Sequence, residues 1–154
     1  MHRSKSHVHH PNLRIERWHR HWVFGSLFVV FASGTAWLVA RFFLRSASQF
    51  GESIHPLEPY AIKIHGAAAM LLLFFVGTLL NGHIRRALKA RRNLATGWTM
   101  IVTLALLVLT GFGLYYLAGE GDRTLWSGMH WIVGLIASTA FIVHLLVGRA
   151  TRRH

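Results

Sequence analysis

Four long apolar segments, separated by short polar ones, dominate the hydrophobic pattern of the chain. A helix needs about 20 apolar residues to cross the hydrocarbon core of a bilayer, and each segment is long enough. A transmembrane barrel would alternate polar and apolar residues along its strands, and none of the segments does so. The pattern therefore predicts four membrane-spanning helices, at about Trp22–Leu44, Tyr60–Ile84, Thr96–Ala118 and Leu125–Val147.

Local signals refine these helices and define the domain organisation. Pro59 suits a first helical turn, and Asp122 and Thr96 are residue types that cap helix N-termini. The first segment is too long for a signal peptide and is followed by arginine, so we expect it to be retained. The expected fold class is all-α. A four-helix transmembrane bundle over residues 21–150 would be flanked by a basic, histidine-rich tail at 1–20 and a short tail at 151–154.

The distribution of charge indicates an orientation in the membrane. The chain has 154 residues, 17 Lys and Arg and 5 Asp and Glu, which gives a net charge of +12. Thirteen basic residues lie on the side of the two termini and four on the opposite side. By the positive-inside rule, this split predicts a bacterial inner-membrane protein with both termini cytoplasmic. Because topology and anionic lipid account for the charge, we expect membrane lipid and no nucleic acid as a partner.

Composition restricts the chemistry that the chain can perform. The absence of cysteine excludes disulfides, iron–sulfur clusters, thiolate zinc sites and haem attached through C-x-x-C-H. The five acidic residues lie almost entirely outside the apolar segments and form no acid pair or triad, so we expect no catalytic residue. Twelve histidines remain as possible ligands. Ionisable side chains inside a membrane are costly and usually mark a functional site.

Four histidines lie in line on two of the predicted helices. His130 and His144 are 14 residues apart and His65 and His83 are 18 apart, so each pair shares a helix face. A six-coordinate b-type haem takes one neutral imidazole from each of two facing helices at the same depth. We therefore expect two haems b, with His65 and His130 as iron ligands on the outer side and His83 and His144 on the inner side.

The spacing on the two helices does not match. Between their histidines the rise is about 21 Å on the fourth helix and about 27 Å on the second. A tilt, or a local distortion at Gly77 or at the Asn–Gly before His83, would absorb the difference. Otherwise another residue replaces His83, and His21 at the start of the first helix is the first choice. Asn81–Gly82 could also end the second helix and leave His83 in the headgroup layer.

The two halves of the chain resemble each other. The first span contains FASGTAWLV and the third VLTGFGLYYL. The spans that follow them open with histidine, in KIHGAAAM and GMHWIVGL, and close with histidine and arginine, in GHIRRAL and VHLLVGRA. This pattern indicates an internal duplication of a helical hairpin. We attribute the small residues of SGTAW and TGFG to close helix packing. The duplication favours His83 as the fourth ligand.

The chain resembles the membrane di-haem cytochrome b families, which include the bacterial b-561 type and the b subunits of formate dehydrogenase and nickel–iron hydrogenase. The resemblance covers about residues 18–150. It rests on four short-looped helices and a His-x13-His pair in the last, with further histidines near the starts of helices one and two. These histidines are His21, His65, His130 and His144.

The resemblance implies quinone-linked electron transfer across the membrane. It favours His21 as the fourth ligand, because these families do not require a histidine at the position of His83. His83 instead suits cytochrome b of the bc complexes, in which two helices bear two ligands each. We favour His83 and keep His21 as the alternative.

The expected function is therefore transmembrane electron transfer through two bis-histidine b haems. These would link a quinone or quinol pool to a partner redox protein or catalytic subunit, because the chain has no room for its own flavin or nicotinamide domain. Tyr115 and Tyr116 are candidates to line a quinone pocket. One alternative is a haem-free anchor subunit of a larger complex. Another is a histidine-based metal-binding or transport protein, although such sites usually add carboxylate or thiolate ligands.

Overall fold

Four long helices make up most of the computed structural model, which describes residues 15–49 and 51–151. Each is long and apolar enough to cross a membrane, so the fold is that of a multi-pass membrane protein, as the hydrophobic pattern predicts. A π-helix and a short α-helix, α3, extend the second of them to Lys89. The helical elements are α1 (Arg17–Phe43), α2 (Leu57–Leu79), the π-helix (Leu80–Ile84), α3 (Arg85–Lys89), α4 (Leu94–Tyr116) and α5 (Arg123–Ala150).

The expected tails fall largely outside the described residues. Residues 1–14, with their four tail histidines, and residues 152–154 are not described. Helix α1 begins at Arg17, which is inside the segment expected to be the N-terminal tail. The first span is therefore longer at its basic end than the apolar pattern alone indicates.

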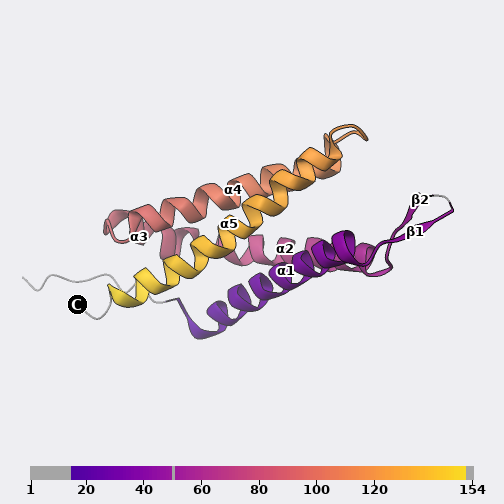
Figure 1. Ribbon diagram of the computed structural model, residues 1–154. Helices are drawn as coiled ribbons and strands as arrows, with labels where there is room; N and C mark the ends of the chain where they lie inside the picture. Colours follow the sequence, from indigo (N-terminus) through magenta and orange to yellow (C-terminus); the bar gives the residue numbers. More distant parts are fainter. Residues whose placement is uncertain (1–14, 50, 152–154) are drawn as a thin grey trace, which may run out of the picture.

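The helices form two hairpins, α1–α2 and α4–α5, which lie as two layers (Figure 1). The two helices of each hairpin pack closely against each other, whereas the backbones of α2 and α5 do not. Between the layers α1 approaches α5, and the rings of Phe24 and Phe141 meet edge to face with centroids 5.6 Å apart. An apolar core around Val23, Leu72 and Phe75 lies within the first hairpin. The space between α2 and α5 is therefore not closed by direct helix packing.

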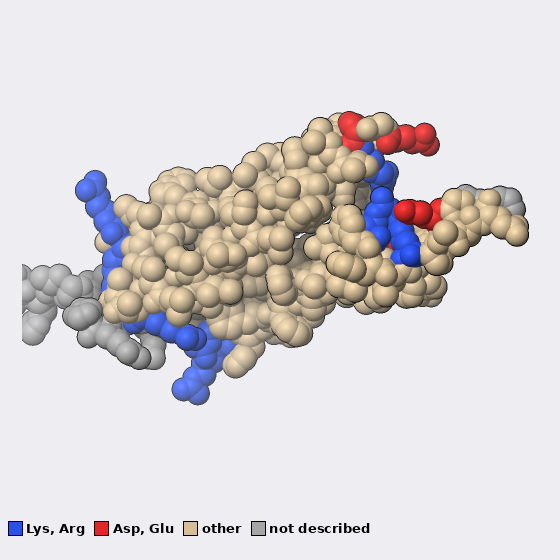
Figure 2. Space-filling view, viewed as in Figure 1, with Lys and Arg blue, Asp and Glu red and all other residues tan. Residues whose placement is uncertain are grey.

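The surface is apolar between two charged ends. In Figure 2 the basic side chains gather at both ends of the molecule, and the acidic ones are visible at one end only. Large apolar side chains between the ends are widely exposed, among them Phe28 at 71% and Met70 at 75%. Soluble proteins rarely expose apolar surface on this scale. Contact with lipid accounts for it.

A small β-hairpin joins α1 to α2 and projects beyond the helices (Figure 1). Its antiparallel strands are β1 (Ser46–Ser48) and β2 (Gly51–Ser53). Arg45 holds its base, because its Nε and Nη2 donate to the two carboxylate oxygens of Glu58 at 2.6 and 2.7 Å. These bonds, with a longer one to Glu52, raise the pKa of Arg45 above its ordinary value. The all-α prediction missed this hairpin.

The predicted helix starts are partly correct. Pro59 lies in the first turn of α2, as expected. Asp122 precedes α5, but its carboxylate accepts a hydrogen bond from the indole of Trp126 and caps no backbone amide. The prediction that Thr96 caps α4 is wrong, because the helix begins at Leu94 after Asn93, whose backbone is left-handed with φ of 52°. Thr96 is thereby placed inside the helix, where its hydroxyl is available for another contact.

Candidate functional site

The histidine pair expected on the outer side, here called the outer pair, bridges the two hairpins. His65 of α2 and His130 of α5 have ring centroids 6.2 Å apart and ring planes at 78°. Nδ1 of His65 donates to the carbonyl oxygen of Val30 in α1 at 2.9 Å, with the hydroxyl of Ser33 at 3.3 Å. Nδ1 of His130 lies 2.8 Å from the hydroxyl oxygen of Thr110 in α4. Each ring thus directs Nδ1 into its own hairpin, which leaves Nε2 as the nitrogen for a ligand between the hairpins.

The pair expected on the inner side, here called the inner pair, lies near the other end of the second span and of α5. The rings of His83, in the π-helix, and His144, near the end of α5, have centroids 6.4 Å apart and planes at 90°. Nδ1 of His144 lies 2.9 Å from the hydroxyl oxygen of Thr96 in α4. That hydroxyl donates to the carbonyl of Asn93, so it accepts the Nδ1 proton. The four expected ligands therefore meet as two pairs.

A π-helix carries His83 to its partner. Asn81 and Gly82 do not end the second span, because the chain continues through Leu80–Ile84 into α3. A π turn holds one more residue than an α turn, so it shortens the rise to His83 and rotates its side chain. The expected distortion at Asn–Gly is thus present. It reduces the mismatch between the two histidine spacings.

The alternative ligand His21 lies apart from both pairs. Its side chain is exposed on α1, whereas His83 is the histidine beside His144. The neighbouring His19 packs on α2, where its Nε2 contacts the carbonyl oxygen of Phe75 at 3.2 Å. His55 lies in the loop before α2, where its Nδ1 accepts a hydrogen bond from the amide of Leu57. The geometry therefore brings His83, and not His21, to the inner pair.

Two hydroxyl–glycine dipeptides support the outer histidines, and sequence reasoning missed this role. A Cβ added at Gly34 would lie 3.2 Å from Cε1 of His65, and one at Gly111 3.4 Å from Cε1 of His130. Each glycine follows the hydroxyl residue, Ser33 or Thr110, that lies within hydrogen-bonding distance of the same ring. The signal was the repeated hydroxyl–glycine step in FASGTAWLV and VLTGFGLYYL, which we attributed to helix packing.

The candidate ligands are available only in pairs. Across residues 15–49 and 51–151, no group of three or more His, Cys, Asp or Glu side chains could hold a metal ion. Each histidine pair thus offers two nitrogen donors and no acidic one.

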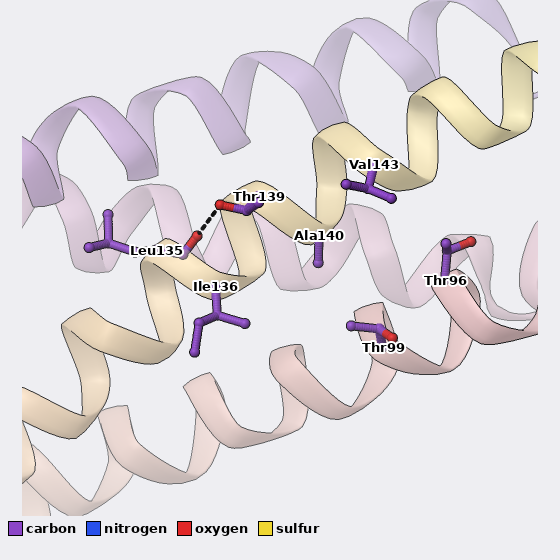
Figure 3. A pocket seen from close by; sticks show the side chains of 7 residues that line it. All are labelled: Thr96, Thr99, Leu135, Ile136, Thr139, Ala140 and Val143. Atoms are coloured by element: carbon purple, nitrogen blue, oxygen red, sulfur yellow. Dashed lines mark hydrogen bonds between the residues drawn. The ribbon is translucent and has the colours of Figure 1, made fainter.

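A largely open cavity of about 480 Å³ lies between α4 and α5 (Figure 3). It connects with the inner pair through Thr96, which both lines the cavity and contacts His144. Tyr115 and Tyr116 do not line this cavity, and 74% of each is exposed. The cavity-lining residues are Thr96, Thr99, Leu135, Ile136, Thr139, Ala140 and Val143.

Comparisons of the chain with models of known protein families, with curated proteins and with solved structures find no match. The two histidine pairs are therefore the basis on which a function can be assigned.

Proposed function

We propose that the chain is a membrane cytochrome b that holds two haems and carries electrons between a quinone or quinol pool and a partner redox protein or catalytic subunit. The separation of the paired rings supports this most directly. A metal–imidazole bond of about 2 Å, with the ring nitrogen about 1.1 Å from the ring centre, gives roughly 6.3 Å between the centroids of two axial imidazoles. The observed separations are 6.2 and 6.4 Å.

The hydrogen bonds of the histidines also fit axial ligands. A metal-bound histidine usually donates its second ring N–H to a carbonyl or another oxygen, which fixes the tautomer and makes the ligating nitrogen more basic. The carbonyl of Val30 and the hydroxyls of Thr110 and Thr96 are in position to accept such bonds. The backbones of α2 and α5 do not pack directly on each other, as a flat macrocycle between them would require. A bound haem would supply a one-electron carrier at each level.

In this proposal each haem would lie between α2 and α5. His65 and His130 would hold the outer haem, and His83 and His144 would hold the inner one. Haem propionates carry negative charge and pair favourably with basic side chains at the membrane surface. Lys63, two residues before His65, is in a suitable position on the outer side.

We further infer that the protein lies in a bacterial inner membrane with both termini in the cytoplasm. The described ends of α1 and α5 lie at the same end of the molecule (Figure 1), and this is the end with the excess of basic residues. The matching roles of Ser33–Gly34 and Thr110–Gly111 support an origin by duplication of one hairpin.

The cavity between α4 and α5 supports the quinone part of the proposal. Its volume of about 480 Å³ is within the usual range for small-molecule sites. Its lining combines aliphatic side chains with threonine hydroxyls, which suits a ring that carries two oxygen atoms. Because Thr96 joins the cavity to His144, we assign the quinone to the side of the inner pair.

Spectroscopy of the purified protein tests this proposal. We expect two haems b per chain and split α bands after reduction with dithionite, and we expect a short-chain quinol to reduce them. A colourless preparation would contradict the proposal and favour a haem-free anchor. A colourless preparation that retains zinc or copper would favour the bare-metal alternative.

Alanine variants test the ligand set. His83→Ala should lose one haem and His21→Ala should keep both, because only His83 lies beside His144. The opposite result would assign the fourth ligand to α1.

A further inference from the structure

We propose that Thr110 and Thr96 are positioning residues, each of which sets the reduction potential of one haem through the Nδ1–H of one histidine. Thr110 acts on His130 and the outer haem, and Thr96 acts on His144 and the inner haem. This inference rests on the proposed function.

The two threonines are spaced to serve the two histidines of α5. Thr96 and Thr110 are 14 residues apart on α4, and His130 and His144 are 14 residues apart on α5. The helices form an antiparallel hairpin, so equal spacing brings Thr110 to His130 and Thr96 to His144. The corresponding distances from Nδ1 to the hydroxyl oxygen are 2.8 and 2.9 Å. One face of α4 therefore contacts one histidine of each pair.

The hydroxyl protons are already used within α4. Thr110 donates to the carbonyl of Leu106 at 2.7 Å, and Thr96 donates to that of Asn93 at 3.2 Å. Each hydroxyl oxygen must therefore accept from Nδ1–H, because a hydroxyl has a single proton to donate. This fixes the tautomer in which Nε2 has the free lone pair. In the first hairpin His65 donates to a backbone carbonyl instead, and no side-chain substitution removes that acceptor.

A hydrogen bond from Nδ1–H gives the imidazole more anionic character and makes Nε2 a stronger donor to iron. A stronger donor stabilises the ferric state more than the ferrous state and so lowers the reduction potential. Removal of the threonine hydroxyl should therefore raise the potential of the haem that it serves. A tenfold change in the ferric-to-ferrous equilibrium of a one-electron couple corresponds to about 59 mV, and we expect shifts on the order of this value.

Thr103 provides a matched control. It lies midway between Thr96 and Thr110 on α4, and its side chain is buried to the same degree as that of Thr110. Its hydroxyl donates to the carbonyls of Thr99 and Met100, and among the described residues no hydrogen bond joins it to a histidine. Valine at this position removes the same hydroxyl from the same helix.

The experiment is a redox titration of full-length protein, followed optically and by the low-spin ferric EPR signal, with haem content measured for each variant. The remaining haem of His130→Ala and of His144→Ala assigns the bands. We expect Thr110→Val to raise the outer potential alone and Thr96→Val the inner potential alone. Thr110→Ser and Thr96→Ser should restore the native values, and Thr103→Val should change neither. Loss of a haem in a valine variant, with retention in the matching serine variant, also supports the proposal.

Three outcomes would overturn the proposed role of Thr110 and Thr96. Both threonine variants could leave the potentials unchanged, Thr103→Val could shift them as much, or serine could fail to restore them. In each case the native protein still binds two haems, so the proposed function stands and only the role of the threonines fails. Native protein without haem would instead contradict the proposed function itself.

Discussion

Each outer histidine ring lies against a glycine in the neighbouring helix of its own hairpin. At Gly34 an added Cβ would approach Cε1 and Nδ1 of His65 to 3.2 and 3.3 Å. The ring cannot easily retreat, because Nδ1 is held on the same side by the carbonyl of Val30. Glycine at this position therefore sets how deeply the imidazole lies against α1, and with it the position of Nε2.

Gly34→Ala should weaken the outer haem site. Overpacking of this kind costs about 1–3 kcal/mol, because the ring must move or its hydrogen bond must lengthen. We expect partial loss of the outer haem during purification and a changed EPR signal, with the inner haem unaffected. Gly25→Ala on the same helix is the control, since an added Cβ there meets nothing within 4 Å. Equal haem retention and equal EPR signals in the two variants would show that Gly34 does not fix the position of the His65 ring.

The sequence is sufficient to identify the histidines but not their hydrogen-bond acceptors. His130 and His144 are evident because ionisable residues inside apolar helices are rare and these two share a face. Serine and threonine in membrane helices commonly bond the carbonyl four residues earlier, as Ser26 and Thr103 do here. Thr110 makes the same bond and also contacts His130. Only the packing of α4 on α5 shows that Thr110, unlike Thr103, contacts a histidine.

Among the elements, the junction of α1, the β-hairpin and α2 depends on one nearly buried ion pair. The Arg45 and Glu58 side chains are only 14% and 7% exposed, and two hydrogen bonds join them. Glu52 also contacts Arg45, at 3.3 Å, but its side chain is 73% exposed. An exposed pair contributes little to stability, whereas loss of one partner from a buried pair leaves an uncompensated charge.

Glu58→Gln should therefore loosen the β-hairpin much more than Glu52→Gln. Loss of one partner costs about 3–5 kcal/mol in a fully buried pair, whereas an exposed pair contributes about 0–1 kcal/mol, and the pair of Glu58 with Arg45 lies between these limits. We expect faster amide hydrogen exchange over residues 46–53 and easier proteolysis in that segment. Glu52→Gln, the control, should change exchange only slightly. Similar effects of the two variants would show that the hairpin is held by its backbone pairing instead.

The long helices could be predicted and the short elements could not. Apolar length alone identifies α4 and α5, because a run of about 20 uncharged apolar residues is typical of a membrane-spanning helix. The strands of the β-hairpin are three residues each and rich in serine and glycine, so they have no alternating pattern to detect. The π-helix is equally hidden, because Asn81–Gly82 is more typical of a helix end. Its continuation into α3 is evident only from the structure.

At the scale of the whole molecule, the two histidine pairs lie at two depths along the same pair of helices. The 14 residues between His130 and His144 correspond to about 21 Å of helix, a large part of the roughly 30 Å hydrocarbon core. The two sites of the proposed cytochrome would thus lie near opposite membrane surfaces. In the proposed function, this separation would allow exchange with a partner at one surface and with a quinone near the other.

The orientation of the molecule in the membrane can be tested with single cysteines, because the native chain has none. Ala47→Cys introduces a thiol on the exposed β-hairpin, and Lys89→Cys introduces one at the exposed end of α3. In intact spheroplasts an impermeant maleimide should label the first and not the second, because the positive-inside rule keeps the α3 end in the cytoplasm. Opening the membrane should expose both. The loss of one lysine leaves the large basic excess of that side unchanged, so the substitution itself should not invert the protein. Labelling of Lys89→Cys alone in intact spheroplasts would reverse the orientation and move the proposed quinone side to the periplasm.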